Sequence, residues 1–516
     1  MAGVIPVYRG YTHAAISLLR SSPVAWTIDR YLKDHLLEKE YVPESNRYIN
    51  GRWRKVWAHW EPKYKYYRYD TKSQKLYVPI AFCDDIVALL RREGLNVDIR
   101  KENDYPLRKI DVAMKPGWTD KDHQIELIKA CSNPEPGMRG LSMQTGKGKT
   151  YSAIKSWVNL GYVGIVIVGG LVDQWIDSIR ECTNIDKDYI YKLQEFDSLN
   201  LLAHNPQYKP LIFVASLKTM QLFCDGSENY GMLPWDFAGF FREYGIGVKI
   251  VDECHRCFHA TVLMDLATNV PYPMYASATF TQSSRQAREI FNRVFPTSIQ
   301  YGLQAYDKYV ECYFHTFLGE VQEKKVMKKR GYNHVKYEKE LMICERKLNT
   351  HVNEVLQPLI DMYYINRKTD PKQRLLIFCS SIEFIEALVC KLKRLYPDHI
   401  VKSYIGGNAL HDIDDAQIIV STPGKASTGL DLKRLIAVLN TVSISAESTI
   451  LQLFGRLRKI EGMRLAYVDV SDSNIAAVRR HAEERMNLLR KVCTRFYYYE
   501  GLHDLSVQSG TPYQGL

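Results

Sequence analysis

Short runs of apolar, mainly β-branched residues recur from about residue 101 onward, separated by stretches with helical spacing. Three such runs, at 164–168, 211–215 and 248–252, each end in small or polar residues. A continuous apolar run is typical of a strand buried on both faces of a parallel sheet. Because strands and helices alternate, the pattern predicts an α/β fold in which helices cover the sheet.

A second block repeats this pattern nearer the C-terminus. Its apolar runs lie at 375–379, 416–421, 436–440 and 465–469. We therefore expect two parallel-sheet lobes in tandem, the first over 111–302 and the second over 371–495, followed by a tail at 496–516. The two lobes could be one fold used twice.

The segment between the two blocks, 303–370, is charged and has helical spacing. We interpret it as a linker followed by the first helix of the second lobe. It contains a basic run at 324–330 and a long helical pattern at 348–364. A basic run of this kind either forms a solvated face or contacts phosphate, and both interpretations stay open.

Residues 1–110 do not share the alternation and predict a small α+β accessory domain. In the segments 46–55 and 60–69, aromatic and basic residues interleave. Such a surface can stack on bases while it neutralises phosphates. Tyr-rich antiparallel hairpins have the same composition for packing reasons, so DNA binding by this domain is one of two interpretations.

The composition fits a large soluble protein with a polyanionic partner. At 516 residues the chain is long enough for three or four domains, and 25% charged residues is ordinary for a globular protein. Its net charge of +11 suits nucleic acid, although many metabolic enzymes are equally basic. The eleven cysteines form no paired framework, and the longest apolar stretch is too short to cross a bilayer. We expect a cytoplasmic protein with reduced thiols and no membrane partner.

The strongest local signal is Met143-Gln-Thr-Gly-Lys-Gly-Lys-Thr150, followed by a helical pattern. In such a loop the backbone N–H groups turn toward phosphates, a lysine reaches the β- and γ-phosphates, and a hydroxyl binds Mg²⁺. Met143 stands where the strict phosphate-loop pattern has glycine. The predicted nucleotide contacts are Thr145, Gly146, Lys147, Gly148, Lys149 and Thr150, with Thr150 also a metal ligand.

Two further motifs follow strands of the first block. Asp252 and Glu253 end the run at 248–252, and a carboxylate pair here is what metal-assisted hydrolysis needs. Asp252 would hold the Mg²⁺ shell, and Glu253 would orient and deprotonate the attacking water. Ser277 and Thr279 follow another short strand and would couple this acidic motif to the γ-phosphate. Taken alone, the carboxylates could be an ordinary acidic turn.

Cys254 and Cys257 interleave with His255 and His259, which has the local look of a metal site. A closed zinc site needs four ligands, and no second Cys or His pair lies nearby at that spacing. We therefore interpret this stretch as part of the acidic motif.

The second block supplies Gln452-Leu-Phe-Gly-Arg-Leu-Arg458 on a helix expected to begin near Ser448. An arginine from a second lobe can stabilise charge on a γ-phosphate, because its fork of donors matches phosphate oxygens. Arg456 is the candidate for this role. An arginine on a helix surface is otherwise usually solvated, so the assignment depends on the other motifs.

In this order the motifs resemble those of superfamily-two helicases over about residues 115–495. The resemblance implies two RecA-like lobes that bind and hydrolyse ATP with Mg²⁺. Asp252-Glu-Cys-His255 is similar to the DExH class rather than to the DEAD-box RNA helicases. Ser421-Thr-Pro-Gly-Lys-Ala-Ser-Thr-Gly-Leu-Asp431 is similar to the fifth motif of UvsW-type phage recombination helicases and their XPB- and RecG-like relatives.

The resemblance also implies roles for individual residues. Those implied to contact the nucleotide are Gln124, which would read adenine, His255, Gly429, Asp431, Gln452 and the catalytic arginines Arg456 and Arg458. Those implied to grip the nucleic-acid backbone are Gly170, Gln174, Ser216, Lys218, Ser380, Gly407 and Thr422. The chain departs from the family at Lys121 and His123 beside Gln124, and at Lys459, where the second arginine usually stands. The second catalytic cation could therefore be Arg458, Lys459 or neither.

We therefore expect an ATP-dependent DNA helicase or translocase that unwinds or branch-migrates forked and junction DNA in phage replication, recombination or repair. As a phage protein it would act as a monomer in the host-cell cytoplasm. A double-strand translocase and an RNA helicase remain alternatives, because loops that grip phosphates do not read sequence. A protein that clamps branched nucleic acid, with ATP as a slow switch, is an alternative of another class. A small-molecule kinase would leave the second lobe and Arg456 without a role.

Overall fold

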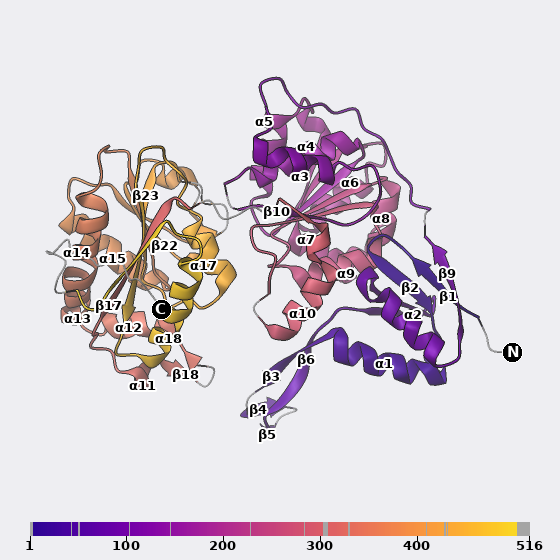
Figure 1. Cartoon of the computed structure of the whole chain (residues 1–516), viewed down its shortest axis with the longest axis horizontal. Helices are drawn as coiled ribbons and strands as arrows, with labels where there is room; N and C mark the ends of the chain where they lie inside the picture. The colour runs from indigo at the N-terminus through magenta and orange to yellow at the C-terminus, as the bar shows by residue number, and fades with distance from the viewer. Residues whose placement is uncertain are drawn as a thin grey trace. The chain divides into compact units, whose positions relative to one another are not determined.

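The computed structural model describes residues 4–502 apart from short gaps, and the chain forms two compact units, 1–304 and 305–516 (Figure 1). The gaps are 43, 50–51, 103, 145, 228, 283, 303–307, 329–330, 409, 428–429 and 431. Among the described helices, none has both the length and the apolar character needed to cross a membrane.

The first unit contains a seven-stranded, all-parallel sheet in the order β12-β13-β11-β14-β15-β10-β16. Its strands are β10 (Arg139–Ser142), β11 (Gly164–Val168), β12 (Ile190–Leu193), β13 (Ile212–Ser216), β14 (Val248–Asp252), β15 (Tyr272–Ser277) and β16 (Gln300–Tyr301). All three apolar runs predicted to be strands in this part of the chain are confirmed as strands of one sheet.

Helices cover both faces of this sheet, which explains why its central strands are largely apolar. Side chains alternate between the faces, so Val166 and Val168 join one core while Ile165 and Ile167 join the other. The first core includes α3 (Asp122–Cys131), α4 (Lys149–Leu160) and α5 (Val172–Cys182). The second includes α6 (Glu195–Ala203), α7 (Leu217–Cys224), α8 (Phe237–Glu243) and α9 (Phe258–Thr268).

The N-terminal region forms a mixed sheet in the order β7-β8-β2-β1-β9 and packs against the first lobe. Its elements are β1 (Val4–Arg9), β2 (His13–Ser17), α1 (Pro23–His35), β7 (Arg68–Asp70), β8 (Lys75–Pro79), α2 (Cys83–Arg92) and β9 (Asn96–Lys101). One apolar core joins this sheet to α9 and to α10 (Arg285–Val294). Asn269 strengthens the junction, since its Oδ1 accepts from the backbone N–H of Tyr11 at 2.6 Å.

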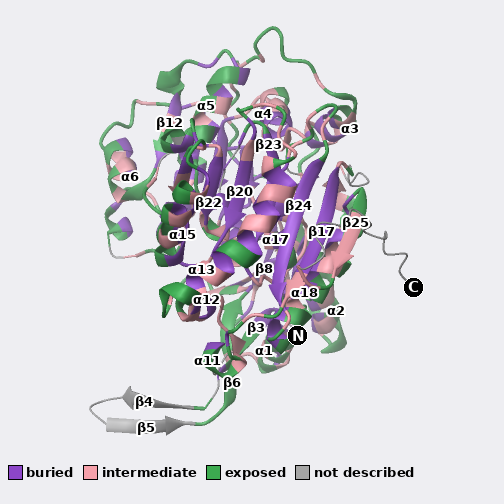
Figure 2. Ribbon diagram, turned by 90° about the vertical axis from the view of Figure 1, so that its left-hand side faces the viewer, coloured by how far each residue is buried: buried purple, intermediate pink, exposed green. Residues whose placement is uncertain are grey.

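A narrow antiparallel ribbon projects from this N-terminal region (Figures 1 and 2). Its base is formed by β3 (Leu37–Val42) paired with β6 (His59–Lys65), and its tip by β4 (Ser45–Ile49) paired with β5 (Arg52–Val56). The tip register pairs Ile49 with Arg52.

The second unit contains another seven-stranded, all-parallel sheet, in the order β21-β22-β20-β23-β24-β17-β25. Its strands are β17 (Val310–Phe317), β20 (Arg374–Phe378), β21 (Val401–Tyr404), β22 (Ile418–Ser421), β23 (Leu435–Asn440), β24 (Leu465–Asp472) and β25 (Arg495–Tyr499). The four runs predicted in this block are confirmed as strands. Most residues of the inner strands are buried between helices (Figure 2).

Two strands of this sheet come from stretches interpreted as linker and tail. β17 lies within 303–370, and β25 crosses the boundary expected at 495; they pair with each other along five residues. In β17 the side chains of Glu311 and His315 interrupt the apolar pattern, yet both are buried. Tyr313 and Arg367 contact Glu311, and the Tyr363 hydroxyl contacts His315. These partners explain why Glu311 and His315 can be buried in the strand.

The helices of the second unit include the long pattern expected at 348–364, which is confirmed as a helical segment with π-helical turns at His351–Leu356 and Asp361–Ile365. The others are α11 (Glu323–Val326), α12 (His334–Met342), α13 (Glu345–Thr350), α14 (Gln357–Ile360), α15 (Ile382–Leu395), α16 (Pro423–Ser427), α17 (Glu447–Phe454) and α18 (Ala476–Leu489). The described part of the basic run lies in α11 and in a small hairpin, β18 (Met327–Lys328) with β19 (Gly331–Tyr332), where Lys325 pairs with Glu340.

Candidate active site

The loop between β10 and α4 has the backbone geometry of a phosphate cradle. Gly146 and Gly148 take left-handed φ angles of 86° and 90°, which L side chains rarely adopt. The loop leads into helix α4, which begins at Lys149. The first backbone N–H groups of a helix have no acceptor within the helix, so those at this end can bind phosphate. Thr150 lies in the first turn of this helix and is partly exposed. Thr145 lies outside the described residues.

Gln124, predicted to read adenine, is buried and holds the loop in place. Its Nε2 donates to Lys147 O at 3.0 Å, while its Oε1 accepts from Lys121 N at 3.0 Å. A Cβ on Gly148 would lie 2.2 Å from Gln124 Nε2, so the loop and the glutamine fit only with glycine at that position. His123 Nε2 also lies 2.9 Å from Lys147 O.

Lys149 and the two carboxylates predicted to be catalytic come together at the carboxyl ends of β10 and β14. Lys149 Nζ lies 2.6 Å from Glu253 Oε1 and 3.0 Å from Asp252 Oδ1. Burial by itself would lower the pKa of Lys149, but the two carboxylates outweigh it and the pKa is raised. Burial would likewise raise the pKa of Glu253, and the lysine charge overrides it, so the pKa is lowered. Lys149 and Glu253 are therefore both charged at neutral pH.

The backbone and side chains around Asp252 fix where these carboxylates lie. Glu253 has a φ of 50°, a conformation that costs a residue with a side chain roughly 1–2 kcal/mol. This turn lets the Glu253 N–H donate to Asp252 Oδ1 at 3.0 Å. Trp175 Nε1 donates to the other oxygen, Asp252 Oδ2, at 3.1 Å. Trp175 was not among the predicted site residues, because a tryptophan in an amphipathic helix is otherwise ordinary core.

His255, Ser277 and Thr279 form a chain of hydrogen bonds behind Glu253. Ser277 Oγ donates to Thr279 O at 2.6 Å, so it must accept from His255 Nδ1 at 2.8 Å. Burial lowers the pKa of His255 to about 4, which keeps the ring neutral with its proton on Nδ1. The same nitrogen lies 3.4 Å from Glu253 Oε2. The two motifs predicted to be coupled are thus in direct contact. Within the described residues, the buried Thr279 Oγ1 has no hydrogen-bond partner.

The donors at this site fit Mg²⁺ held jointly with phosphate. Asp252 and Thr150 offer a carboxylate and a hydroxyl, the oxygen ligands that Mg²⁺ prefers. Across the described parts of the chain, no three His, Cys, Asp or Glu side chains gather into a metal site of their own. Because Mg²⁺ usually takes one or two carboxylates plus substrate phosphates, a site completed by a nucleotide is what these residues support.

Four residues predicted to grip a nucleic acid lie at the same carboxyl edge of the first sheet. Gly170 and Gln174 follow β11 and are exposed, as is Lys218 after β13. Ser216 instead caps helix α7, where its Oγ accepts from Thr219 N at 3.3 Å. Loops at the carboxyl ends of parallel strands are where open α/β sheets bind ligands, so these residues share an edge with the phosphate loop.

In the second unit the predicted backbone contacts also follow strand ends. Gly407 lies in the loop after β21, and Thr422 follows β22 and caps α16 by accepting from Lys425 N at 3.2 Å. Lys425 Nζ donates to Asn408 O at 3.0 Å, which ties these two loops together. The N–H of Ser380 already donates to the buried carboxylate of Glu338. Its backbone therefore serves a protein contact in this structure.

The arginine motif lies at the end of α17, which begins at Glu447, close to the predicted start. Gln452 is buried within the helix, whereas Arg456 and Arg458 follow it in the next turn. Arg456 is buried, and its Nη1 donates to Leu430 O at 2.6 Å, which joins the motif to the segment after α16. Gly429 and Asp431, expected near the ribose, lie outside the described residues.

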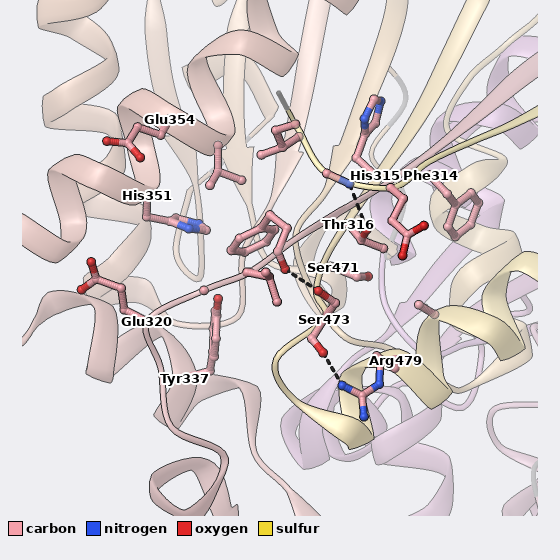
Figure 3. A pocket seen from close by; sticks show the side chains of 18 of the residues that line it. Phe314, His315, Thr316, Glu320, Tyr337, His351, Glu354, Ser471, Ser473 and Arg479 are labelled. Atoms are coloured by element: carbon pink, nitrogen blue, oxygen red, sulfur yellow. Dashed lines mark hydrogen bonds between the residues drawn. The ribbon is translucent and has the colours of Figure 1, made fainter. Parts of the chain in front are cut away.

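A separate cavity of about 680 Å³ lies in the second unit at the carboxyl ends of β17 and β24 (Figure 3). No predicted site residue lines it. Ser473 Oγ donates to Phe317 O at 2.9 Å, and Arg479 donates to Ser473 O, so these groups close one wall. The cavity is also lined by four glutamates, Glu320, Glu354, Glu483 and Glu500, and by two basic residues with long side chains, Lys347 and Arg479.

Each unit combines an all-parallel sheet, helices on its faces and predicted contact residues in the loops at its carboxyl edge. They are RecA-like lobes. Among solved structures, the chain is similar to Saccharomyces cerevisiae Dbp5 bound to RNA and ADP BeF3, with 14% identity over 74% of this chain and 90% of that one, at a TM-score of 0.49.

It is also similar to the ATP-dependent Type ISP restriction-modification enzyme LlaBIII bound to DNA, with 12% identity and a TM-score of 0.48. That match covers 80% of this chain but only 34% of the enzyme's, so the chain spans about a third of its length. No protein-family model and no curated protein matches the chain.

Proposed function

We propose that this protein is a Mg²⁺-dependent ATPase that moves along nucleic acid, a helicase or translocase with two RecA-like lobes. The observation that carries the proposal is the contact of Lys149 with both Asp252 and Glu253 at the end of the phosphate loop. A lysine, a metal-binding carboxylate and a second carboxylate within 3 Å of one ammonium form the core of an NTP-hydrolysing centre.

Each of the three residues has a distinct task. Lys149 balances the two carboxylates, and nucleotide phosphates would replace them as its anionic partners. Asp252, held on both oxygens by Trp175 and the Glu253 N–H, would then bind Mg²⁺ together with Thr150. Bound Mg²⁺ would supply charge neutralisation at the phosphates. Released from the lysine, Glu253 would accept the proton of the attacking water, and loss of the lysine charge that lowers its pKa would make it a stronger base.

The remaining residues predicted at the nucleotide keep their proposed roles. Gln124 would read adenine from its position beside the loop, and Arg456 would stabilise charge on the γ-phosphate. Gln452, Arg458, Gly429 and Asp431 complete the proposed nucleotide contacts. The neutral His255, bonded to Ser277, would report the state of Glu253 to the segment around Thr279.

The proposed track is DNA, gripped through Gly170, Gln174, Ser216, Lys218, Ser380, Gly407 and Thr422. Exposed loops at the carboxyl edge of each sheet support backbone contact, which is independent of sequence. Forked or junction DNA, and a role in phage replication, recombination or repair, follow from the resemblance to UvsW-type helicases. Of the two similar structures, one holds RNA and the other DNA, so they do not choose between these polymers.

The test is a panel of polymers in a steady-state ATPase assay with Mg²⁺. We expect single-stranded DNA, duplex, fork, four-way junction and RNA to stimulate turnover unequally, with the fork or the junction strongest. Equal stimulation by plain duplex would favour a double-strand translocase, and strongest stimulation by RNA would favour an RNA helicase. If ATP bound but no polymer caused its hydrolysis, the chain would instead be an ATP-switched clamp.

A further inference from the structure

The projecting ribbon formed by β3, β4, β5 and β6 exposes large aromatic side chains far from any core. Tyr41 is 53% exposed, Trp60 is 65% exposed, and Trp57, just before β6, is 66% exposed. Tyr41 and Trp60 are direct cross-strand partners, with ring centroids 5.5 Å apart in an edge-to-face arrangement. Single exposed apolar residues are common, but three large aromatics on one two-stranded ribbon mark a binding surface.

The tip of the ribbon adds a concentrated positive charge. Residues 45–56 contain Arg47, Arg52, Arg54 and Lys55 and no Asp or Glu. The strand register sets Arg47 directly opposite Arg54. Like charges in cross-strand positions destabilise a hairpin, and a bound polyanion would remove that cost. The same register pairs Tyr48 with Trp53.

The base of the ribbon rests on the two segments that leave the candidate active site. Tyr64 stacks on His259, at 4.3 Å between ring centroids, and His259 lies in the first turn of α9, directly after the acidic motif. Glu38 is buried and accepts from Ser284 Oγ at 3.2 Å. Ser284 caps helix α10 just after Thr279.

One more hydrogen bond links the segment before α10 to the acidic motif. In the segment between Thr279 and Ser284, Gln282 donates to the backbone oxygen of His255. The base of the ribbon therefore contacts both motifs that flank Glu253, through short chains of packed and hydrogen-bonded groups. A force or displacement on the ribbon has a continuous physical route to the hydrolytic residues.

We propose that the ribbon is a nucleic-acid-binding arm, which stacks unpaired bases on Trp60 and Tyr41, neutralises phosphates at its tip, and signals occupancy through Tyr64 and Ser284. The inference rests on the proposed function for its second half only. Stacking on aromatic side chains beside a basic surface is how proteins hold single strands without reading sequence. Protein interfaces also use Trp, Tyr and Arg, but a tip with four cations and no carboxylate favours a polyanion.

Binding is tested by fluorescence anisotropy with labelled single-stranded DNA, forked DNA and single-stranded RNA at two salt concentrations. Because Trp60 is exposed, Trp60→Ala should fold normally, which its thermal unfolding midpoint checks. We expect it to weaken binding of oligonucleotides with unpaired bases roughly tenfold. Arg52→Gln with Arg54→Gln should weaken binding and reduce its salt dependence. The DNA and RNA arms identify which polymer the ribbon holds.

The matched control is Trp26→Ala. Trp26 is 67% exposed in α1 of the same unit, outside the ribbon. We expect this variant to bind like the wild type. Unchanged affinity of Trp60→Ala at both salt concentrations would overturn the proposal and leave the ribbon as a surface for a protein partner. An equal loss in the Trp26 and Trp60 variants would also overturn it.

Signalling is tested separately with Tyr64→Ala, which removes the stack on His259. We expect its affinity for oligonucleotide to stay within about twofold while the maximal nucleic-acid-stimulated kcat falls several-fold. Wild-type kcat in this variant would refute the route through the base. If no polymer stimulates ATP hydrolysis in the wild type, the proposed function fails, whereas a Trp60-dependent affinity would still support the arm.

Discussion

Trp175 offers a sharp test of how the candidate active site is positioned. Its indole N–H is one of the donors that hold Asp252, and the side chain is only 4% exposed. Trp175→Phe keeps an aromatic ring in the core but removes that donor. A hydrogen bond to a charged group contributes roughly 1.5–3 kcal/mol, and 1.4 kcal/mol of lost transition-state stabilisation lowers a rate tenfold.

If about half of that energy is lost in the transition state, kcat should fall roughly four- to tenfold. The Mg²⁺ concentration needed for half-maximal turnover should rise, since Asp252, the carboxylate that we propose binds the metal, loses its orientation. Both are read from an ATPase assay with Mg²⁺ titrated at saturating nucleic acid.

Trp157→Phe is the matched control for loss of volume. Trp157 is fully buried in the same unit, and its Nε1 donates to Tyr162 O at 2.8 Å rather than to Asp252. We expect it to lower stability but to leave the Mg²⁺ requirement unchanged. A Trp175 variant with wild-type kcat and Mg²⁺ dependence would refute the assigned role of this indole, as would the same Mg²⁺ shift in both variants.

Three further predictions concern other parts of the chain. Gly148→Ala should weaken ATP binding by at least tenfold in a nucleotide titration, because the φ of 90° disfavours a side chain and the new Cβ would displace Gln124. Wild-type affinity for ATP in this variant would contradict the assignment of the loop as a phosphate cradle. Arg485→Met should lower the free energy of unfolding by about 3–5 kcal/mol in urea, since it leaves the buried carboxylate of Asp469 without its bidentate partner. Adding Asp469→Asn should recover part of that loss, and no recovery would contradict the pairing. Burial raises the pKa of Glu338 to about 7, so the folded state binds more protons than the unfolded state between about pH 4.5 and 7. The free energy of unfolding should therefore fall as the pH rises through that window, by at most roughly 1.4 kcal/mol per pH unit. Glu338→Gln should flatten that slope in thermal unfolding scans from pH 5 to 7.5, whereas an unchanged slope would contradict it.

The sheet strands could be predicted where burial on both faces makes a run almost wholly apolar, as at 164–168 and 436–440. β17 escaped prediction because its buried Glu311 and His315 are satisfied by partners distant in sequence, which no local pattern reveals. The packing of the N-terminal sheet against the first lobe could not be predicted from the sequence for a similar reason. Its N-terminal sheet shares a core with α9 and α10, although these segments are more than 150 residues apart.

The acidic motif and the phosphate loop were predictable because their chemistry requires fixed residue types at short spacing. The contacts of the residues around these motifs could not be predicted. Trp175 belongs to a segment interpreted as a nucleic-acid contact, yet its indole holds Asp252. Ser380 was expected to grip a backbone, yet its N–H donates to Glu338, which is 42 residues away in sequence. Such contacts depend on how strand ends meet in space.

The most direct test of the central claim compares ATP hydrolysis by the wild type and by Glu253→Gln, each with and without forked DNA. The glutamine keeps the size of the side chain but cannot accept a proton from water. We predict that the variant folds and binds ATP yet loses nucleic-acid-stimulated hydrolysis by at least a hundredfold. Undiminished turnover in the folded variant would contradict the role of Glu253, and absence of any hydrolysis in the wild type would contradict the account of the chain as a motor.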